Sequence, residues 1–285
     1  MSSFQATISS TGLASALAAV SISVFNVEAA NINTPQCVTQ AVSSYVSAQP
    51  DRDMIIMVDQ TMVDSISATV AADMYRQLEA KMKAGVRIQL ISFSSFSKGN
   101  YAKHLFTAQW DKPIPSRYMS DIGSTDKRRY AQCLKKQNYI AKRGFGQALA
   151  TAFIPPKSSD NTEIMSAFQQ VSQQVLPVSM ATDKTIILIS DMLEHSATTS
   201  FYSRNRMKKI QVDKELSKVK QANGMSHLRG AKVYVMGAGL SSSKNGYVSQ
   251  QAMTNLERFW QGYIKASQGE LMGFGTPILL NGIAD

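Results

Sequence analysis

The sequence lacks long hydrophobic segments and contains few cysteines. No stretch reaches the roughly 18 apolar residues that indicate a membrane-spanning helix, so no transmembrane span is predicted. The two cysteines, Cys37 and Cys133, are not in a Cys-x-x-Cys spacing, which argues against a zinc site. No Gly-x-Ser-x-Gly segment is present, so the sequence also lacks the nucleophile turn of the α/β-hydrolases.

Basic residues are missing from the first twelve positions, although the segment that follows them is apolar. Leu13 to Phe25 is rich in small and apolar residues, and Val27-Glu28-Ala29-Ala30 resembles a signal-peptidase cleavage site. Two interpretations of residues 1–30 stay open. They are a signal peptide of an exported protein, periplasmic or secreted, or they are an N-terminal extension of a cytoplasmic one.

The state of the two cysteines depends on that choice of compartment. In an exported protein, Cys37 and Cys133 are expected to form a disulfide. It would close a long loop, for which the chain-entropy model gives about 4–5 kcal/mol of stabilisation. In a cytoplasmic protein they would be two unrelated thiols.

The composition fits a globular protein that carries a large positive charge. Hydrophobic residues make up 44% of the 285 positions, which is close to the globular average and sufficient for a full core. The formal net charge is +10. A charge of this size favours acidic partners, nucleic acid or anionic surfaces.

Hydrophobic periodicity predicts strands that alternate with helices. Three continuous apolar runs indicate buried strands, at Asp53–Asp59, Thr185–Ser190 and Ala231–Met236. Val86–Phe93 alternates apolar and polar residues, which suits a strand nearer the edge, and His104–Trp110 is expected to be a short antiparallel edge strand. Helical patterns cover Met74–Met82, Ile164–Val175, 206–223 and Met253–Ile264. This order predicts an α/β fold, a three-layer doubly wound sandwich with a mainly parallel sheet.

The same patterns suggest one domain with additions. Residues 31–52 are expected to form a lead-in with a short helix, residues 53–270 the domain, and residues 271–285 a C-terminal tail. The domain has an elaborated region at about residues 100–158, of which 111–158 is expected to be irregular.

Acidic residues follow two of the predicted buried strands. Asp59 ends the first strand, with Thr61 two positions later, and Asp191 follows the second strand directly after Ser190. Ligands of open parallel sheets bind at the carboxyl ends of the strands. The two carboxylates and the hydroxyl are therefore expected to share a crevice, and a hard divalent cation suits such a set of oxygens.

This order of residues resembles the von Willebrand factor A (vWA) domain with its metal-ion-dependent adhesion site. In that family the first loop reads Asp-x-Ser-x-Ser, a second loop supplies a Thr and a third an Asp. The matching residues here are Asp59, Thr61, Thr162 and Asp191. The resemblance implies that these four hold Mg²⁺ or Mn²⁺ and that a protein partner binds the ion through a carboxylate. It also implies a non-enzymatic interaction module.

One position departs from the family pattern. Val63 stands where the second hydroxyl of the first loop belongs, and valine cannot coordinate a cation. Ser65 lies two residues later and reaches the site only if the loop is distorted. The site is therefore degenerate, and it is expected to be weakened, completed by water or vestigial. Taken singly, Asp59 would also be a suitable helix cap.

Two alternatives to this interpretation rest on other residues. A hydrolase centred on Asp191, Glu194 and His195 is disfavoured, because catalytic triads assemble from separated loops rather than from six neighbouring positions. Basic residues with interleaved aromatics at 127–143 and 204–209 suit a nucleic-acid-associated protein. The other interpretation of these basic segments is solvated helix and loop surface.

Overall fold

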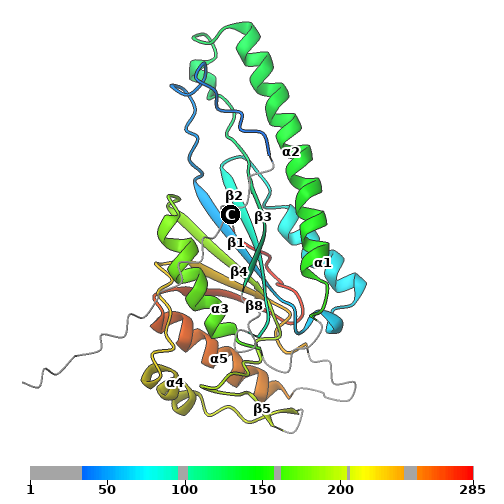
Figure 1. Cartoon of the computed structure of the whole chain (residues 1–285), viewed down its shortest axis with the longest axis vertical. Coiled ribbons are helices and arrows are strands. Elements are labelled where there is room, and N and C mark those ends of the chain that lie inside the picture. Colours follow the sequence, from blue (N-terminus) through cyan, green and yellow to red (C-terminus); the bar gives the residue numbers. More distant parts are fainter. Residues whose placement is uncertain (1–33, 96–101, 157–161, 204–205, 241–248, 285) are drawn as a thin grey trace, which may run out of the picture.

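The computed structural model describes residues 34–95, 102–156, 162–203, 206–240 and 249–284. Its centre is a six-stranded sheet with the strand order β3-β2-β1-β4-β7-β8, in which every pairing is parallel except that of β3 with β2 (Figure 1). The strands are β1 Arg52–Asp59, β2 Val86–Phe93, β3 Lys103–Gln109, β4 Asp183–Ile189, β7 Lys232–Met236 and β8 Glu270–Gly275. The fold class predicted from the sequence is confirmed.

The sheet has helices on both faces, because alternate residues of its central strands point to opposite sides. Ile55 and Met57 of β1 belong to a core with helices α3 (Ile164–Gln170), α4 (Val212–Gln221) and α5 (Gln250–Ala266). Met54, Ile56 and Val58 belong to a second core, with α1 (Ala68–Glu79) and α2 (Ser124–Ala152). All five of these β1 side chains are fully buried, which explains why the strand is apolar without alternation.

The expectation of an irregular segment at 111–158 is wrong. Most of it forms α2, a helix of 29 residues. Its buried stripe consists of Tyr130, Gln137, Ala141, Phe145 and Leu149. Because this stripe contains a glutamine and an alanine, and basic residues dominate the rest of the helix, apolar periodicity gave little indication of it.

Three smaller expectations are also wrong. Residues 40–45 of the lead-in form turns rather than a helix, although Val42 and Val46 are buried. The segment 271–285 is not simply a tail, since β8 pairs in parallel with β7 and completes the sheet. Gly273 and Gly275 interrupt the apolar pattern of β8, so it did not resemble a strand.

The predicted helix at 206–223 begins only at Val212, after a two-stranded hairpin of β5 (Tyr202–Ser203) and β6 (Arg206–Met207).

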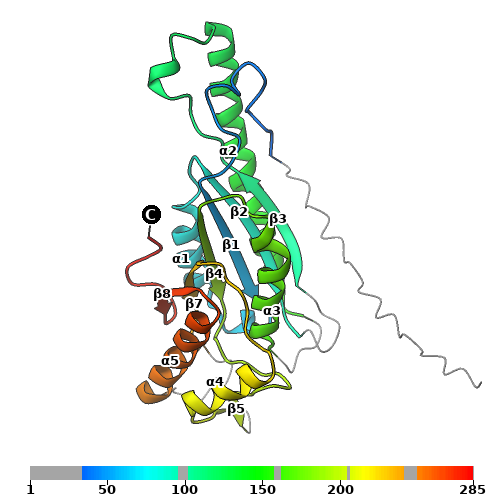
Figure 2. The same ribbon diagram turned by 90° about the vertical axis from the view of Figure 1, so that its left-hand side faces the viewer.

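An arm extends beyond the amino ends of β1 and β2. We use this name for residues 34–51, 110–123 and the first half of α2, which lie side by side in both views (Figures 1 and 2). A disulfide joins Cys37 to Cys133 across 96 positions. A small core surrounds it, with Val42, Ile122 and Tyr130 among its buried side chains.

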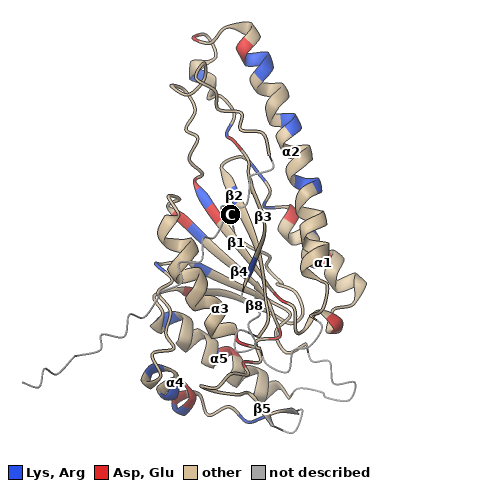
Figure 3. Cartoon of the chain, viewed as in Figure 1, with Lys and Arg blue, Asp and Glu red and all other residues tan. Residues whose placement is uncertain are grey.

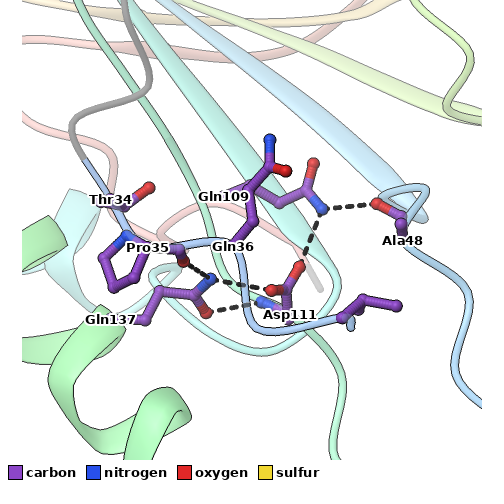
Figure 4. A pocket seen from close by; sticks show the side chains of 8 residues that line it. Thr34, Pro35, Gln36, Ala48, Gln109, Asp111 and Gln137 are labelled. Atoms are coloured by element: carbon purple, nitrogen blue, oxygen red, sulfur yellow. Dashed lines mark hydrogen bonds between the residues drawn. The ribbon is translucent and has the colours of Figure 1, made fainter. Parts of the chain in front are cut away.

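A polar network supports the same arm, around a pocket between the lead-in and α2 (Figure 4). The Asp111 carboxylate accepts hydrogen bonds from the Cys37 amide at 2.8 Å, from Gln137 Nε2 at 2.9 Å and from Gln109 Nε2 at 3.0 Å. Gln137 Nε2 also donates to the carbonyl of Pro35 at 2.8 Å. These bonds attach the lead-in to α2 next to the disulfide.

Within the described ranges, no helix is long and apolar enough to cross a membrane.

Candidate functional site

The candidate site lies where the strand order reverses. β1 and β4 are neighbours at the centre of the sheet, and the chain leaves them toward opposite edges. In doubly wound folds, ligands bind at the carboxyl ends of the two strands that flank this point. Asp59 is the last residue of β1, and Ser190 and Asp191 follow β4 directly. The topology therefore brings both predicted carboxylates to one end of the sheet.

Asp59 is fully buried, and three donors surround its carboxylate. Oδ1 accepts hydrogen bonds from the Thr61 amide at 3.0 Å and from Thr61 Oγ1 at 2.6 Å. Oδ2 accepts one from Ser190 Oγ at 2.8 Å. The first loop and the end of β4 are thus joined through this one side chain.

Two threonines from distant loops meet beside Asp59. Oγ1 of Thr61 lies 2.7 Å from Oγ1 of Thr162, although the two residues are 101 positions apart. The backbone of the third loop holds Thr162 in place, since the His195 amide donates to the Thr162 carbonyl at 2.8 Å. Glu194 contributes as well, because its Oε2 accepts from the Met165 amide, at the start of α3, at 3.1 Å.

Asp191 is almost completely buried and is held by its own loop. The Leu193 amide donates to Oδ1 at 2.9 Å, and the Tyr202 hydroxyl donates to Oδ2 at 3.1 Å. Met192, between them, has a φ of 64°, a left-handed conformation that is uncommon for a residue other than glycine. Such backbone geometry clusters at functional sites. Here it turns the chain so that the backbone amide of Leu193 points at the Asp191 carboxylate.

Burial dominates the electrostatics of the site. Loss of solvation raises the pKa of Asp59 to about 6, against the opposing effect of hydrogen bonds from Thr61 and Ser190. Burial, together with the nearby charge of Asp59, raises the pKa of Asp191 to about 8. Burial also raises the pKa of Glu194 to about 8. A positive charge between the first two carboxylates would relieve their mutual repulsion.

The structure adds two residues that the sequence analysis did not assign. Ser190 fixes Asp59, and its position directly before Asp191 at the strand end was the available signal. Tyr202 contacts Asp191 from the β5–β6 hairpin. Nothing in the sequence places Tyr202 there, since the contact depends on how the third loop folds.

Among the described residues, neither Val63 nor Ser65 forms a side-chain hydrogen bond with the site. Val63 is buried in the core on the α1 side of the sheet. Its side chain contributes packing and no oxygen. The Ser65 hydroxyl is buried and has no hydrogen-bond partner within the described ranges. The departure from the family pattern at Val63 is therefore not compensated by Ser65.

The residues of the hydrolase alternative do not form a catalytic pair. Asp191 bonds to Leu193 and Tyr202, and Glu194 bonds to the start of α3. Nδ1 of His195 is buried and has no hydrogen-bond partner among the described residues. A triad needs a carboxylate that orients the imidazole, and the described part of the chain does not provide that bond.

The two basic segments lie apart from each other. Residues 127–143 are on α2, and the first part of that stretch belongs to the arm. In segment 204–209, residues 204–205 lie outside the described residues, and Lys208 approaches Glu215 at 3.5 Å. Segment 127–143 alone therefore forms a described basic surface.

Comparison with known proteins gives a fold-level likeness. No protein-family model matches the chain, and no curated protein matches it either. An aerotolerance-related membrane protein from Bacteroides fragilis is 16% identical, with 78% of this chain and 91% of that chain covered and a TM-score of 0.35. The pilus adhesin SpaC from Lactobacillus rhamnosus GG is 14% identical over 74% and 26%, with a TM-score of 0.38.

Proximal thread matrix protein 1 from the mussel byssus is similar at the same level. It is 14% identical with a TM-score of 0.34, and the match covers 75% of this chain and 48% of that one. This chain thus spans about half of that protein. All three likenesses concern the fold alone.

Proposed function

We propose that this chain is a non-enzymatic protein-interaction module of the vWA type. It binds Mg²⁺ or Mn²⁺ at the carboxyl end of its sheet and, through that ion, a carboxylate of a protein partner. One observation carries the proposal. The hydroxyls of Thr61 and Thr162 come from loops 101 residues apart and lie 2.7 Å from each other, next to the buried carboxylate of Asp59.

The donors present fit such an ion. Mg²⁺ prefers oxygen ligands in octahedral geometry, in which neighbouring ligands lie about 2.9 Å apart. The spacing of the two threonine hydroxyls is close to this value. Each of the four proposed ligands offers oxygen, and Asp59 and Asp191 supply the negative charge. No group of three or more His, Cys, Asp and Glu side chains suited to a metal occurs in the described part of the chain, so hydroxyls are needed to complete the set.

Each residue has a separate role in this proposal. Thr61 and Thr162 are direct ligands, and Asp59 and Asp191 act directly or through water. Ser190 orients Asp59, and Tyr202 orients Asp191. The bound ion would supply a Lewis-acidic position for an incoming carboxylate. Since Val63 offers no oxygen, one more water would be needed than in the family pattern, which would lower the affinity for the ion rather than abolish it.

Calorimetric titration of Mg²⁺ and of Mn²⁺ into the purified protein tests the site. We expect saturable binding that is lost in Asp59→Ala and in Asp191→Ala. Asp121→Ala is the matched control, since this carboxylate is exposed on the arm. Binding that survives both site substitutions, or no binding by the folded wild type, would refute the proposal.

The partner's chemistry needs its own test. With Mn²⁺ bound, an acidic peptide should enter the coordination sphere and change the relaxation rate of water protons, whereas its amidated form should not. An equal response to both peptides would contradict carboxylate recognition.

We also propose that the protein is exported. The disulfide supports this, because such bonds persist in oxidising compartments. The apolar segment at 13–25 lies outside the described residues and supports export through its sequence alone. Intact-mass measurement after expression in a secreting host should show loss of roughly the first 30 residues, as the apolar signal-like segment predicts, together with an oxidised cysteine pair. A full-length reduced chain would contradict export.

A further inference from the structure

Basic residues occur in pairs at a fixed interval along α2. The pairs are Arg128-Arg129, Lys135-Lys136 and Lys142-Arg143, and each begins seven residues after the previous one. We call these six residues the basic ladder. The helix as a whole has seven Lys or Arg residues but only one acidic residue, Asp126. Much of the net charge of +10 is therefore concentrated on this element, as Figure 3 shows.

Helix geometry places the ladder on one side of α2. Seven residues make nearly two turns, so successive pairs lie about 10.5 Å apart along the axis and face nearly the same way. At about 100° per residue, Tyr139 falls inside the arc that the ladder covers. Its side chain is 65% exposed. The face thus consists of repeated cations around one exposed aromatic ring.

Most of the ladder has no countercharge among the residues that the structure describes. Arg128, Lys135, Lys136 and Arg143 are exposed, and none of them has an ion-pair partner within the described ranges. Lys142 is 3.2 Å from Glu79 of α1. Arg129 approaches Asp126 at only 3.9 Å. The neighbouring cations of the ladder therefore repel one another, and a bound anionic partner would reduce this repulsion.

The opposite side of α2 is fixed to the protein, which determines where the ladder points. The disulfide at Cys133 and the bonds of Gln137 attach this side to the lead-in. Tyr130 donates from its hydroxyl to the Lys112 carbonyl at 2.6 Å, and Trp110 Nε1 donates to Asn138 Oδ1 at 3.0 Å. The ladder is thus presented to solvent on a braced helix, before any partner binds.

We infer that the basic ladder is a docking surface for an acidic α-helix of a partner protein. A second helix repeats its side chains at the same interval of about 10.5 Å per seven residues. Glu or Asp pairs at that period would face all three ladder pairs at once, as charges flanking the contact between paired helices do. Tyr139 and the arginines belong to the residue types that dominate binding energy at protein interfaces.

Other anionic surfaces fit this face less well. The phosphates of duplex DNA present a charge about every 1.7 Å along the axis, far more densely than the ladder pairs. Shallow insertion into a membrane needs an apolar face, and the apolar face of α2 is packed against the protein. The surface lies away from Asp59 and Asp191, so its role is independent of the proposed cation site.

Fluorescence anisotropy with a labelled helical peptide tests this inference on the full-length oxidised protein. The probe peptide carries Glu pairs every seven residues. An isomer of the same composition and helicity carries them every five residues, which distributes the charges around the helix. We expect the seven-residue peptide to bind at least about tenfold more tightly than the isomer, because only its charges share one face.

Variants identify the surface. Lys135→Glu with Lys136→Glu should weaken binding about tenfold or more, and a probe with Lys pairs in place of its Glu pairs should regain affinity for that variant. Lys214→Glu with Lys220→Glu, on the exposed side of α4, makes the same change in net charge and should have little effect.

Three outcomes would overturn the inference. They are equal binding of the two peptides, equal weakening by the α2 and α4 variants, and tighter binding of duplex DNA or of anionic vesicles than of the seven-residue peptide. The last outcome would assign the ladder to nucleic acid or to a lipid surface instead.

Discussion

The carboxylates at the two ends of the sheet have different kinds of partner. At the amino end, Asp53 is fully buried and bonds to Arg87, whose Nε donates to Oδ1 at 2.6 Å. Asp183 forms an ion pair with Arg52 there, also at 2.6 Å. At the carboxyl end, Asp59 and Asp191 have hydroxyl and amide donors but no cationic partner among the described residues.

We interpret this difference as a division of roles, in which the carboxylates at the amino end stabilise the fold and those at the carboxyl end bind a ligand. The chain neutralises the carboxylates at the amino end with its own guanidinium groups, so we assign them to the fold. Asp59 and Asp191 at the carboxyl end are fully or almost fully buried but have no countercharge among the described residues, although charged groups are rarely buried unpaired. A bound cation would supply the missing positive charge next to Asp59 and Asp191. The predictions below separate these two assignments.

Removing the disulfide should give the largest loss in the free energy of unfolding, and it should leave Mg²⁺ binding unchanged. Cys37→Ser with Cys133→Ser opens a loop that spans 96 positions. The chain-entropy model gives a loss of about 4–5 kcal/mol in the free energy of unfolding, measurable by denaturant titration. Under conditions in which the variant stays folded, Mg²⁺ binding should be unchanged. A loss of Mg²⁺ binding by the folded variant would show that the arm and the site are coupled.

Removing the buried carboxylate at the amino end should cost somewhat less. Asp53→Ala leaves Arg87 without its partner, and we expect a loss of about 3 kcal/mol in the free energy of unfolding. Arg87→Met combined with Asp53→Leu removes both charges and should cost less than the single substitution. A loss below about 1 kcal/mol for Asp53→Ala would be typical of an exposed pair, and it would contradict a structural role for this one.

The corresponding change at the carboxyl end should have little effect without a cation. Asp191→Asn keeps an acceptor for Leu193. Because burial raises the pKa of Asp191 to about 8, this carboxyl is mostly protonated at neutral pH when no cation is bound, so we expect a change in the free energy of unfolding within about 1 kcal/mol. Added Mg²⁺ should raise the melting temperature of the wild type, by linkage, but not that of the variant. A large loss of stability in Asp191→Asn without Mg²⁺ would make this residue structural.

The smallest effect should come from the partly buried pair of Arg52 and Asp183 at the amino end. Burial alone would raise the pKa of Asp183, but the hydrogen bond and charge of Arg52, together with Lys232, hold it below its usual value. A lowered pKa stabilises the fold above the unfolded pKa of about 4, and this contribution disappears as the pH falls further. Arg52→Met should therefore cost less than about 1 kcal/mol at neutral pH.

The pH dependence of that cost is the measurement to make. The difference in unfolding free energy between wild type and Arg52→Met should shrink as the pH falls below about 4, and it should level off once the pH is below the lowered pKa of Asp183 in the wild type. A difference that is constant over this range would show that Arg52 acts through packing alone.

The sequence was most informative where one physical signal dominates. Strands buried on both faces are continuously apolar, so β1 and β4 were predicted, and with them the positions of Asp59 and Asp191. Family resemblance supplied Thr162, and the structure places it against Thr61. That these residues bind a cation is our proposal.

Other features depend on tertiary contacts that no local pattern encodes. Helix α2 was missed because Gln137 and Ala141 stand in its buried stripe, where the polar network of the arm accepts a glutamine. β8 was missed because Gly273 and Gly275 interrupt its apolar pattern. Glycine stands there because the neighbouring chain packs too closely for a side chain. A Cβ at Gly275 would lie 2.5 Å from the backbone of Ile278. Tyr202 reaches Asp191 only through the fold of the third loop.

The most direct test of the central claim is a double-mutant cycle on Mn²⁺ affinity, measured by electron paramagnetic resonance. If Thr61 and Thr162 hold one ion together, Thr61→Val and Thr162→Val should each weaken binding about tenfold or more, and the double variant should lose little beyond either single one. Wild-type affinity in both single variants, or no Mn²⁺ binding by the folded wild type, would contradict the claim.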